Sequence, residues 1–431
     1  MGFMDEMKAF RKEARRLDRT DPLRRFRRRF FIPPGTIYLD GNSLGLLSRD
    51  GASSLEGAVE AWKRLGIRGW LEADPPWFTL AERLGERCAA LVGAEPGEVV
   101  LSGTTTVNIH TLVHTFYKPE GRRTRIIADE LDFPTDIYAL KSVLRLRGLD
   151  PAANLVLVRS RDGLTLDERD IASLFDETTA LVFLPSVLYR SGQLLDLEML
   201  AARAHEKGIP IGFDCSHSVG AVPHEFDRWG IDFALWCSYK YLNGGPGSTA
   251  FLYVNKAHHA KEPALAGWFG SAKERQFDMA LDFTPAPGAG RWQISSPSIL
   301  SAAPLIGSLR IFEEAGIAAV RERSLRLTGF LMDMADALLA PDPCGFTIGT
   351  PRLDGRRGGH VALIHPEGLR IAEALRARGV VPDFRPPDIV RIAPVALYNT
   401  FGELWTLVRH LREIVETRDY ERYPAKRRAI C

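Results

Sequence analysis

Short apolar segments alternate with amphipathic stretches between Val99 and Val254, and most of the apolar segments are hydrophobic at every position. Strands have this composition when both faces of their sheet are covered. The pattern therefore predicts a large α/β domain whose mainly parallel sheet is built by βαβ crossovers. We expect its seven strands at residues 99–101, 125–128, 155–158, 181–184, 209–213, 233–236 and 249–253, with helices such as 136–146 and 196–207 between them.

The hydrophobic pattern changes after Ser298. Long helices are expected at 300–314 and 317–339, followed by strands at 361–364 and 388–392, a helix at 367–378 between them and a last helix near 403–416. This section predicts a small α+β domain. Because 431 residues exceed what one hydrophobic core usually supports, we expect an N-terminal helical segment joining the small domain (1–50), a large domain (51–319) and a small C-terminal domain (320–431).

The composition is typical of a soluble globular protein, with 45% hydrophobic residues, 26% charged residues and a formal net charge of +2. No segment approaches the roughly 18 consecutive apolar residues of a membrane span, so we expect no membrane partner. Five cysteines without C-x-x-C spacing favour a reducing compartment, and they predict neither disulfides nor a zinc knuckle. They are Cys88, Cys215, Cys237, Cys344 and Cys431. We therefore expect a cytoplasmic protein.

One strongly biased segment, Arg24-Arg25-Phe26-Arg27-Arg28-Arg29, lies near the N-terminus. No apolar stretch of the kind found in secretory signals lies beside it, and the acidic residues around it argue against a transit peptide. A basic run can bind nucleic acid, but no base-reading aromatic residue or matching motif accompanies it. We expect a solvated first helix that leads into the body or lies on a partner subunit, and no nucleic-acid partner.

Lys240 has unusual surroundings, because the apolar run from Phe233 ends in Ser238-Tyr239-Lys240 and a glycine-rich turn follows at once. Lysines are rarely fully buried, so a surface lysine that caps a strand is the simpler interpretation. A lysine kept from water, however, loses proton affinity and becomes a nucleophile that forms imines. Such a lysine needs a carbonyl partner, and pyridoxal phosphate (PLP) provides one.

PLP makes three further demands on a sheet-based site, and the ends of the predicted strands offer a residue for each. Asp214 follows the strand at 209–213, where it can pair with the pyridinium nitrogen or cap a helix. Thr105 and Thr106 open a helix after the first strand, where hydroxyl groups and free amides can bind a phosphate or simply cap the helix. Phe133 follows the second strand, where it can stack on the ring or form a hydrophobic staple.

Other polar residues have two interpretations as well. Asp136 can be a second carboxylate near the pyridine edge, and His217 can contact the cofactor or orient the neighbouring carboxylate, although a lone histidine is more often structural. His110 and His114 have the i, i+4 spacing of metal ligands, but no third ligand completes a site and we expect no metal. Arg391 lies in an apolar strand and needs a carboxylate partner, for which a substrate α-carboxylate would serve.

With these residues in place, the chain resembles the kynureninase family of PLP enzymes, which have the aspartate aminotransferase fold, also called fold type I. The resemblance extends from about Tyr38 to Phe401. Its most specific pieces are Gly267-Trp268-Phe269-Gly270 and Cys237-Ser238-Tyr239-Lys240-Tyr241-Leu242-Asn243. The other pieces are the segments Tyr38–Gly45, Phe133–Asp136, Phe213–His217 and Arg391–Asn399.

The resemblance implies a role for each matching position. Lys240 would form the Schiff base, Asp214 would pair with the ring nitrogen, and Phe133 would stack on the ring. The other implied cofactor contacts are Thr105, Thr106, Pro134, Thr135, Asp136, His217 and Tyr239, joined by Trp268 and Ser296 from the neighbouring subunit of a homodimer. Arg391 would bind the substrate carboxylate, and Ser43 and Trp70 would line the pocket for the aryl group.

The resemblance also implies hydrolytic cleavage of the Cβ–Cγ bond of kynurenine to anthranilate and L-alanine, in the tryptophan catabolism that leads toward NAD biosynthesis. Lys240 would remove the Cα proton, and Tyr239 would protonate the alanine fragment. Trp70 together with a small hydroxyl residue at Ser296 resembles the bacterial type of the family, which favours kynurenine over its 3-hydroxy derivative.

Two positions depart from the family pattern. The family has Ser or Thr where this chain has Pro185, so either Ser186 supplies the hydroxyl group or a hydrogen bond is missing. At Ser296 the family has Asn or Thr. These departures leave the cofactor contacts at both positions open.

Two other functions are compatible with parts of the sequence. A cysteine desulfurase or related PLP β-lyase has the same fold, but it typically needs a mobile catalytic cysteine and a histidine just before the lysine, where this chain has Tyr239. A non-catalytic PLP-binding regulator could use the arginine-rich segment as a nucleic-acid arm. No helix-turn-helix domain accompanies that segment, and the presence of both Lys240 and Arg391 favours turnover.

Overall fold

A seven-stranded sheet forms the larger part of the computed structural model, which describes residues 3–426, so that Cys431 lies outside the described residues. The strand order is β2-β8-β7-β6-β5-β3-β4. The bounds are β2 (Val99–Leu101), β3 (Arg125–Asp129), β4 (Leu155–Val158), β5 (Thr179–Pro185), β6 (Ile211–Asp214), β7 (Phe233–Trp236) and β8 (Phe251–Val254). Strands β4, β3, β5, β6 and β7 run parallel, whereas β8 is antiparallel to β7 and β2. The predicted mainly parallel sheet is confirmed.

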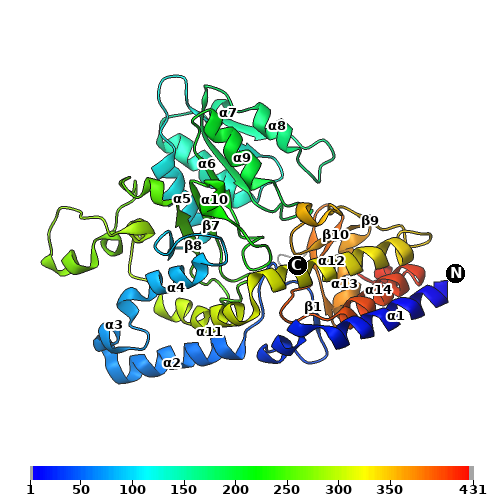
Figure 1. Cartoon of the computed structure of the whole chain (residues 1–431). Coiled ribbons are helices and arrows are strands. Elements are labelled where there is room, and N and C mark those ends of the chain that lie inside the picture. Colours follow the sequence, from blue (N-terminus) through cyan, green and yellow to red (C-terminus); the bar gives the residue numbers. More distant parts are fainter. Residues whose placement is uncertain (1–2, 427–431) are drawn as a thin grey trace.

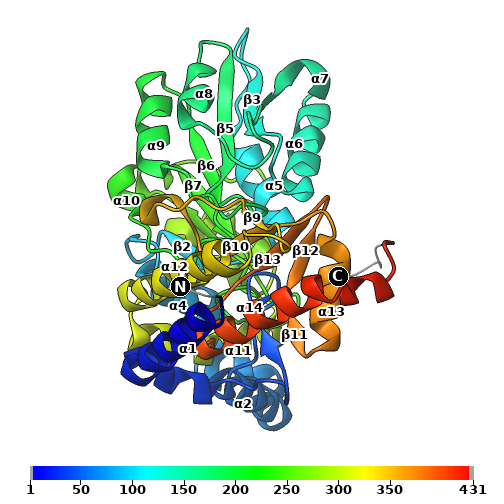
Figure 2. The ribbon, with the colours of Figure 1, turned by 90° about the vertical axis from the view of Figure 1, so that its right-hand side faces the viewer.

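Helices cover both faces of this sheet, which explains why its strands are apolar throughout. Figure 2 shows α8 (Glu168–Ser173), α9 (Leu197–Glu206) and α10 (Phe226–Trp229) on one side of the strands. On the other side lie α5 (Thr105–Phe116), α6 (Pro134–Leu146) and α7 (Pro151–Asn154). Every residue of β5, β6 and β7 is buried, so the polar groups at their ends are the ones that can reach a ligand.

A four-stranded antiparallel sheet of order β12-β13-β10-β9 lies in the C-terminal part of the chain. Its strands are β9 (Thr347–Ile348), β10 (Val361–Ile364), β12 (Asp383–Arg385) and β13 (Ile389–Ile392). It shares a second apolar core with α12 (Ile317–Leu338), α13 (Gly368–Ala377) and α14 (Phe401–Glu416). The strands predicted at 361–364 and 388–392 are confirmed. The domain boundaries stay a prediction.

The N-terminal segment packs on its own chain. Helix α1 (Phe3–Thr20) lies along α12 and α14 (Figure 1). The Phe10 ring is 5.9 Å from the Phe330 ring, and Trp405 Nε1 donates to Met7 O at 3.1 Å. The following 3-10 helix, η1 (Pro22–Arg29), contains the arginine run. Arg27 pairs with Glu403 at 2.6 Å and Arg29 pairs with Asp50 at 2.5 Å. The first helix is thus solvated on one face only, and two arginines of the run hold the segment to the body.

The next part of the chain forms a separate two-stranded sheet. Strand β1 (Ile37–Tyr38) pairs in parallel with β11 (Val380–Val381), and this brings residues 40–45 to the junction between the sheets. Helices α2 (Arg49–Leu65), α3 (Gly69–Glu72) and α4 (Leu80–Ala89) follow, and α2 packs along α11 (Ile299–Ala315). Except for α11, the sequence pattern did not predict these elements.

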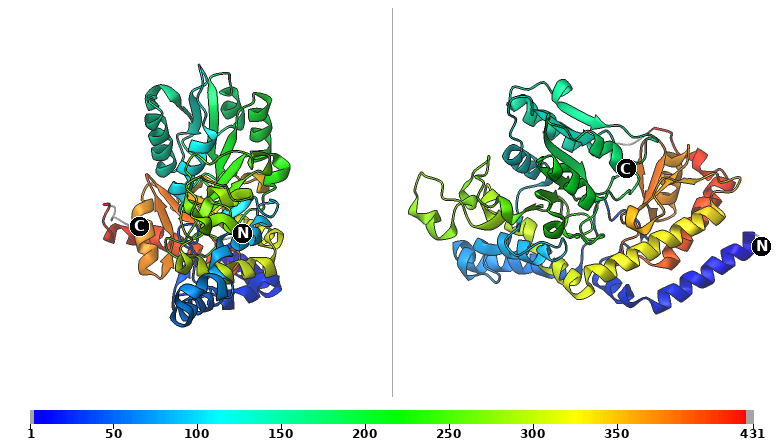
Figure 3. Two further views of the ribbon diagram at one scale, coloured as in Figure 1. Left: turned by 90° about the vertical axis from the view of Figure 1, so that its left-hand side faces the viewer. Right: turned by 45° about the horizontal axis from the view of Figure 1, so that its top comes forward.

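A segment with the short 3-10 helices η5 (Trp268–Gly270) and η6 (Lys273–Asp278) projects from the body, away from the small sheet (Figure 3). Several of its large apolar side chains face solvent, with Trp268 50% exposed and Leu281 102% exposed. Over residues 3–426, no helix is both long and apolar enough to cross a membrane. The four described cysteines are free and buried.

Candidate active site

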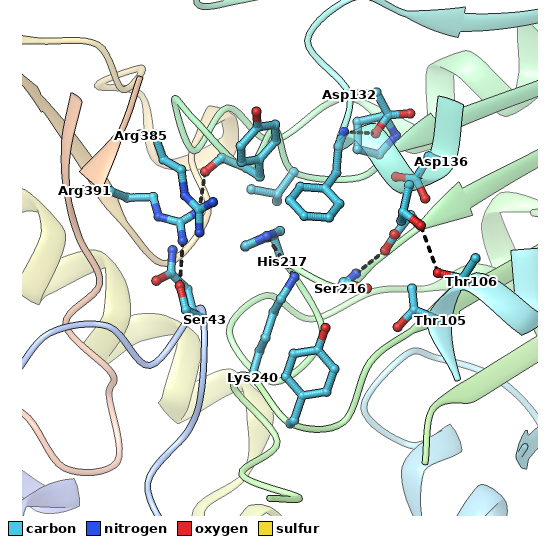
Figure 4. A pocket seen from close by; sticks show the side chains of 18 residues that line it. Ser43, Thr105, Thr106, Asp132, Asp136, Ser216, His217, Lys240, Arg385 and Arg391 are labelled. Atoms are coloured by element: carbon cyan, nitrogen blue, oxygen red, sulfur yellow. Dashed lines mark hydrogen bonds between the residues drawn. The ribbon is translucent and has the colours of Figure 1, made fainter. Parts of the chain in front are cut away.

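A cavity of about 280 Å³ lies where the ends of β3, β5, β6 and β7 meet the small sheet (Figure 4). Parallel strands expose their carboxyl ends at one edge, and this is where sheets of this class bind ligands. The lining residues are Asn42, Ser43, Thr105, Thr106, Asp132, Phe133, Thr135, Asp136, Pro185, Val187, Tyr189, Asp214, Ser216, His217, Tyr239, Lys240, Arg385 and Arg391. Eleven of these residues are among the predicted site residues, and the structure brings them together.

Lys240 lies in the turn that follows β7 and is half-buried. Its Nζ is 2.9 Å from His217 Nε2. The segment from residue 40 to 45 packs on this turn, because Gly45 N donates to Tyr239 O at 2.7 Å. A Cβ atom at Gly45 would overlap the Lys240 carbonyl oxygen, so this close contact requires glycine. The N-terminal segment thus fixes the lysine turn.

Burial and neighbouring charges set the protonation of the groups around Lys240. Burial lowers the pKa of His217 well below its usual range, and the charges of Lys240 and Arg391 lower it further. The imidazole is therefore neutral, and Nε2 can accept a hydrogen bond from Nζ. Burial also raises the pKa of the Tyr239 phenol, which keeps its proton. Lys240 thus lies between a neutral acceptor and a protonated phenol.

Asp214 is the last residue of β6, and the amide of Ser216 donates to its Oδ1 at 2.7 Å. Burial raises the pKa of Asp214, while the charge of Lys240 and the hydrogen bond from Ser216 oppose that shift. A cationic ring nitrogen beside this carboxylate would favour its charged form.

Two further carboxyl groups follow β3. Asp132 and Asp136 are buried, and burial raises the pKa of each well above the usual range. After burial, the largest contribution to the raised pKa of Asp132 comes from the charge of Asp136. For the raised pKa of Asp136 it comes from the charge of Asp214. We call Asp132, Asp136 and Asp214, together with Lys240, the acidic wall.

Two helices begin at the acidic wall. Gly103 has a φ of +53°, in the left-handed region that favours glycine, and it leads the chain from β2 into α5. The hydroxyl groups of Thr106, in the first turn of α5, and Thr135, in the first turn of α6, are 2.9 Å apart. The first amide groups of each helix have no partner within the helix, so this point favours an anion.

An aromatic side chain stands beside these helix ends. Phe133 precedes α6, is 42% exposed, and meets the Tyr189 ring edge-on at 5.3 Å between centroids. A large apolar ring that is exposed at the mouth of a polar cavity can pack against a flat ligand.

The opposite side of the cavity, which we call the arginine wall, consists of Arg385, Arg391, Asp383 and Ser43. Arg391 Nη2 lies 2.6 Å from Asp383 Oδ2 and donates to Ser43 Oγ at 2.8 Å. Its Nη1 donates to Tyr189 O at 2.6 Å. These contacts join β13 to the N-terminal segment and to the loop after β5. In Figure 4 both guanidinium groups face Lys240 and His217 across the cavity.

Four predicted site residues do not line this cavity. Pro134 is the first residue of α6, and Trp70 packs on Trp77 and Phe269 with ring distances of 6.1 and 5.8 Å. Trp268 lies on the projecting segment, and Ser296 lines a separate cavity of about 380 Å³ with Gly103 and Thr104. Their roles stay predictions.

Several lining residues had no predicted role, and Asp132 and Arg385 are the charged ones among them. Asp132 immediately precedes the predicted Phe133, and Arg385 lies in a strand of three residues. Pro185 lines the cavity, whereas the hydroxyl of the buried Ser186 contacts Ser218 Oγ at 2.7 Å and Asp214 O at 3.2 Å. Ser186 is thus engaged within the protein and does not replace a hydroxyl group at Pro185.

Comparison with known proteins identifies the family of this chain. A family model described as Kynureninase C-terminal domain matches residues 320–411, and one described as Aminotransferase class-V matches residues 38–341. A protein named kynureninase from Geobacillus thermodenitrificans is 53% identical over 418 residues, which cover 97% of this chain and 97% of that protein. The chain belongs to the kynureninase family. This confirms the family, the fold class and the class of PLP-dependent hydrolase predicted from the sequence.

Solved structures with the same fold are more distant. A cysteine desulfurase from Thermococcus onnurineus NA1 superposes with a TM-score of 0.78 at 18% identity, covering 91% of this chain and 98% of that one. A variant of C-DES with glycine covalently linked to its PLP cofactor has a TM-score of 0.77 at 17% identity, covering 90% and 99%. At these identities the likeness shows the fold alone.

The cavity of this kynureninase family member fits PLP. His217 Nδ1 and Asp136 Oδ1 are buried and have no hydrogen-bond partner among residues 3–426, so both require a polar group from a ligand or water. The acidic wall offers an amine and a carboxylate, and the start of α5 offers hydroxyl and amide groups for a phosphate. Phe133 adds an apolar ring.

Proposed function

We propose that this kynureninase family member cleaves the Cβ–Cγ bond of L-kynurenine, with PLP as cofactor, to give anthranilate and L-alanine in tryptophan catabolism. One observation underlies the proposal. In a chain of this family, a lysine amine and a buried carboxylate face two guanidinium groups across one cavity. The acidic wall suits a cationic cofactor ring, and the arginine wall suits the carboxylate of an amino acid.

PLP, when bound, supplies a carbonyl carbon that reacts with amines and a ring that accepts electrons. Lys240 would bind that carbonyl carbon, and Asp214 would pair with the ring nitrogen. Thr105, Thr106 and the first amides of α5 would hold the phosphate, with Thr135 beside them. Phe133 would pack on the ring.

The remaining cofactor contacts belong to the edge of the ring and to the helix start. Asp136 and His217 have the unpartnered buried atoms that can meet polar groups at the ring edge. Pro134 is the first residue of α6 and sets the direction of that helix, because its ring fixes φ. It would therefore place Phe133 and Thr135 correctly.

Two proton transfers fall to Lys240 and Tyr239. Lys240 would take the proton from the substrate Cα. The reaction consumes one water, whose oxygen ends in the anthranilate carboxylate, while Cβ gains a proton as the Cβ–Cγ bond breaks. Tyr239 keeps its phenolic proton because burial raises its pKa, so it is suited to protonate Cβ.

The Tyr239 role has a direct test. Tyr239→Phe removes only the hydroxyl group and is expected to lower kcat for alanine formation by about 10- to 100-fold. The absorbance of the bound cofactor reports whether the site stays intact. An unchanged rate of alanine formation would show that another group protonates Cβ.

Two copies of the chain are proposed to share their active sites. Figure 3 shows that the segment with η5 and η6 projects from the body. Its side chains Trp268 and Leu281 are exposed, and exposed apolar surfaces of this kind usually meet a partner. Trp70 touches Phe269 on that segment, so Trp70 would reach the aryl pocket only in the assembled homodimer. Ser296 would meet the neighbouring cofactor in the same way.

The proposed preference is for kynurenine over 3-hydroxykynurenine. It rests on Trp70 at the aryl pocket together with Ser296. A large indole at that position leaves less room for an additional ring hydroxyl than a smaller side chain. Replacing Trp70 with histidine tests the preference, which we expect to move toward the hydroxylated substrate.

The cysteine desulfurase alternative shares the fold but lacks support at the site. None of the four described cysteines lines the cavity, and Cys344 is buried in the second apolar core. The arginine run, which a nucleic-acid arm would need to be free, includes two side chains paired with acidic residues of the body.

One experiment tests the function. Purified protein saturated with PLP is incubated separately with L-kynurenine, 3-hydroxykynurenine and L-cysteine. We expect anthranilate fluorescence and an equal amount of alanine from kynurenine, a slower reaction with its 3-hydroxy derivative, and no sulfide from cysteine. Sulfide release without anthranilate would identify the desulfurase activity instead.

A further inference from the structure

Arg385 and Arg391 are chemically alike, but the protein uses their guanidinium groups differently. Antiparallel pairing of β12 and β13 sets Asp383 opposite Arg391, with Arg385 two residues further along β12. Asp383 Oδ2 then lies 2.6 Å from Arg391 Nη2 and accepts a hydrogen bond from Arg385 Nε at 2.7 Å. One carboxylate therefore orients both arginines toward the cavity.

The two arginines differ in which of their nitrogens remain without a hydrogen-bond partner within residues 3–426. Both terminal nitrogens of Arg391 contact the protein, since Nη1 donates to Tyr189 O and Nη2 contacts Ser43 and Asp383. Arg385 donates a hydrogen bond to the protein from Nε. Within the part of the chain that the structure describes, no hydrogen bond involves Nη1 or Nη2 of Arg385.

The exposed fractions of the two side chains also favour Arg385 as the residue that a ligand contacts. The side chain of Arg391 is 0% exposed, whereas that of Arg385 is 23% exposed, although both line the cavity. A ligand that enters the cavity can therefore meet the terminal nitrogens of Arg385 without displacing a protein contact. Arg391 Nε also has no partner among the described residues, but that nitrogen is buried.

Arg385 is also held in a fixed orientation. Asp383 holds its Nε, and the guanidinium group lies over the Tyr189 ring at 5.8 Å from the centroid. Tyr189 thus contacts both arginines, through its ring and through its carbonyl oxygen. A guanidinium fixed on two sides presents its free edge as a preformed fork for a carboxylate.

The surroundings favour an anion at this fork. His217, which contacts Lys240, experiences the charges of both Arg391 and Arg385, so the two arginines lie near the reacting amine. The nearby Asp40 does not line the cavity. Burial and the charge of Asp383 raise the pKa of Asp40 to about 6, which brings its neutral form within reach of physiological pH.

We infer that Arg385 binds the α-carboxylate of the substrate directly, through its free Nη1 and Nη2 edge, and that Arg391 is the buried second member of a two-arginine site. The inference rests on the proposed function, because an amino-acid substrate bound at Lys240 places its α-carboxylate beside the reacting carbon. It adds Arg385 to the substrate-binding residues and explains why β12 keeps a charged residue at the cavity.

A comparison of two substrates tests this contact. Kynurenine and its α-carboxamide differ only in the group that Arg385 would bind, which is an anionic carboxylate in one and a neutral amide in the other. We measure the ratio of their kcat/KM values in the PLP-loaded wild type, Arg385→Gln and Arg391→Gln, with the exposed Arg422→Gln as the matched control. Absorbance of the bound cofactor verifies that each variant keeps its site.

We expect the carboxamide to be about 10- to 100-fold worse in the wild type and in Arg422→Gln. In Arg385→Gln this ratio should shrink to within a few-fold, because the charge that recognises the carboxylate is gone. A wild-type ratio in Arg385→Gln together with a reduced ratio in Arg391→Gln would overturn the inference. A wild type that forms no anthranilate from kynurenine would instead refute the proposed function.

A second variant covers the case in which Arg385→Gln fails to bind PLP. Arg385→Lys keeps a cation beside Asp383 but loses the planar fork. We expect its ratio to fall between those of the wild type and a variant without the charge. A ratio equal to that of the wild type would contradict direct binding through the fork.

Discussion

The acidic wall and the arginine wall face each other across one cavity, and they differ both in charge and in how the chain builds them (Figure 4). The acidic wall comes from the ends of neighbouring elements of the large sheet. Contacts at and beside this wall span 23 residues between Lys240 and His217, and 29 residues between Thr106 and Thr135. The arginine wall joins Arg391 to Ser43 across 348 residues.

From this difference we infer two separate tasks for the walls, namely binding of the cofactor and binding of the substrate. A repeated strand–helix pattern places an amine, carboxylates and a helix start at one sheet edge, and this suffices to hold a cofactor. The surface proposed to bind the substrate carboxylate exists only when the N-terminal segment and the small sheet are both in place. A change on either wall should therefore affect a different property.

Replacing the lysine of the acidic wall should have the largest effect. Lys240→Ala removes the amine that we propose binds the cofactor and moves the Cα proton, so kcat is expected to fall by at least about 10³-fold. The absorbance band of the lysine-bound cofactor should disappear at the same time. Lys207→Ala, which changes an exposed lysine at the end of α9, is the control and should keep both. A variant that retained both rate and band would exclude Lys240 as the reacting amine.

The same chemical change should have opposite effects on stability in the two walls. Asp383→Asn leaves two guanidinium groups without their shared carboxylate, and breaking a buried ion pair costs about 3–5 kcal/mol. We expect a loss near the lower end of that range, about 3 kcal/mol, since Arg385 is partly exposed. Urea titration measures it. Asp336→Asn, in an exposed pair with Arg352, should change stability by less than about 0.5 kcal/mol. Equal losses in the two variants would contradict the account of Asp383.

Asp136→Asn on the acidic wall should stabilise the cofactor-free protein at neutral and higher pH. Burial and the charge of Asp214 raise the pKa of Asp136, so above about pH 4 the folded chain binds more protons than the unfolded chain. Its unfolding free energy therefore falls as pH rises through that window. Removing the group should give a gain of about 1–2 kcal/mol near pH 8 and almost none near pH 4. A loss of stability near pH 8 would contradict the sign.

The contrast between the walls also explains what could be predicted from the sequence. The seven strands of the large sheet are apolar runs, and Lys240, Asp214 and Phe133 each follow one of them, so the hydrophobic pattern alone places these three residues at a common edge. Short or mixed elements carry no such signal. Strand β12 has three residues, so Arg385 could not be recognised from the sequence pattern.

Tertiary contacts account for the other differences. The hydroxyl of Ser186 contacts Ser218 and Asp214 inside the protein. A hydroxyl group at residue 186 therefore does not replace one at residue 185, whose side chain faces the cavity. The arginine run at the N-terminus has the composition of a free basic segment, yet Arg27 and Arg29 pair with acidic residues far along the chain. Such pairings depend on packing that no local pattern records.

The division of tasks between the walls can be tested by a single quantity, the dissociation constant of PLP, measured by absorbance titration in Asp214→Asn and Arg391→Gln. We predict that it rises by about 10-fold or more in Asp214→Asn, which loses a charged partner of the ring, and stays within about 2-fold of the wild type in Arg391→Gln. A similar rise in both variants would show that the arginine wall also holds the cofactor, and would contradict the account.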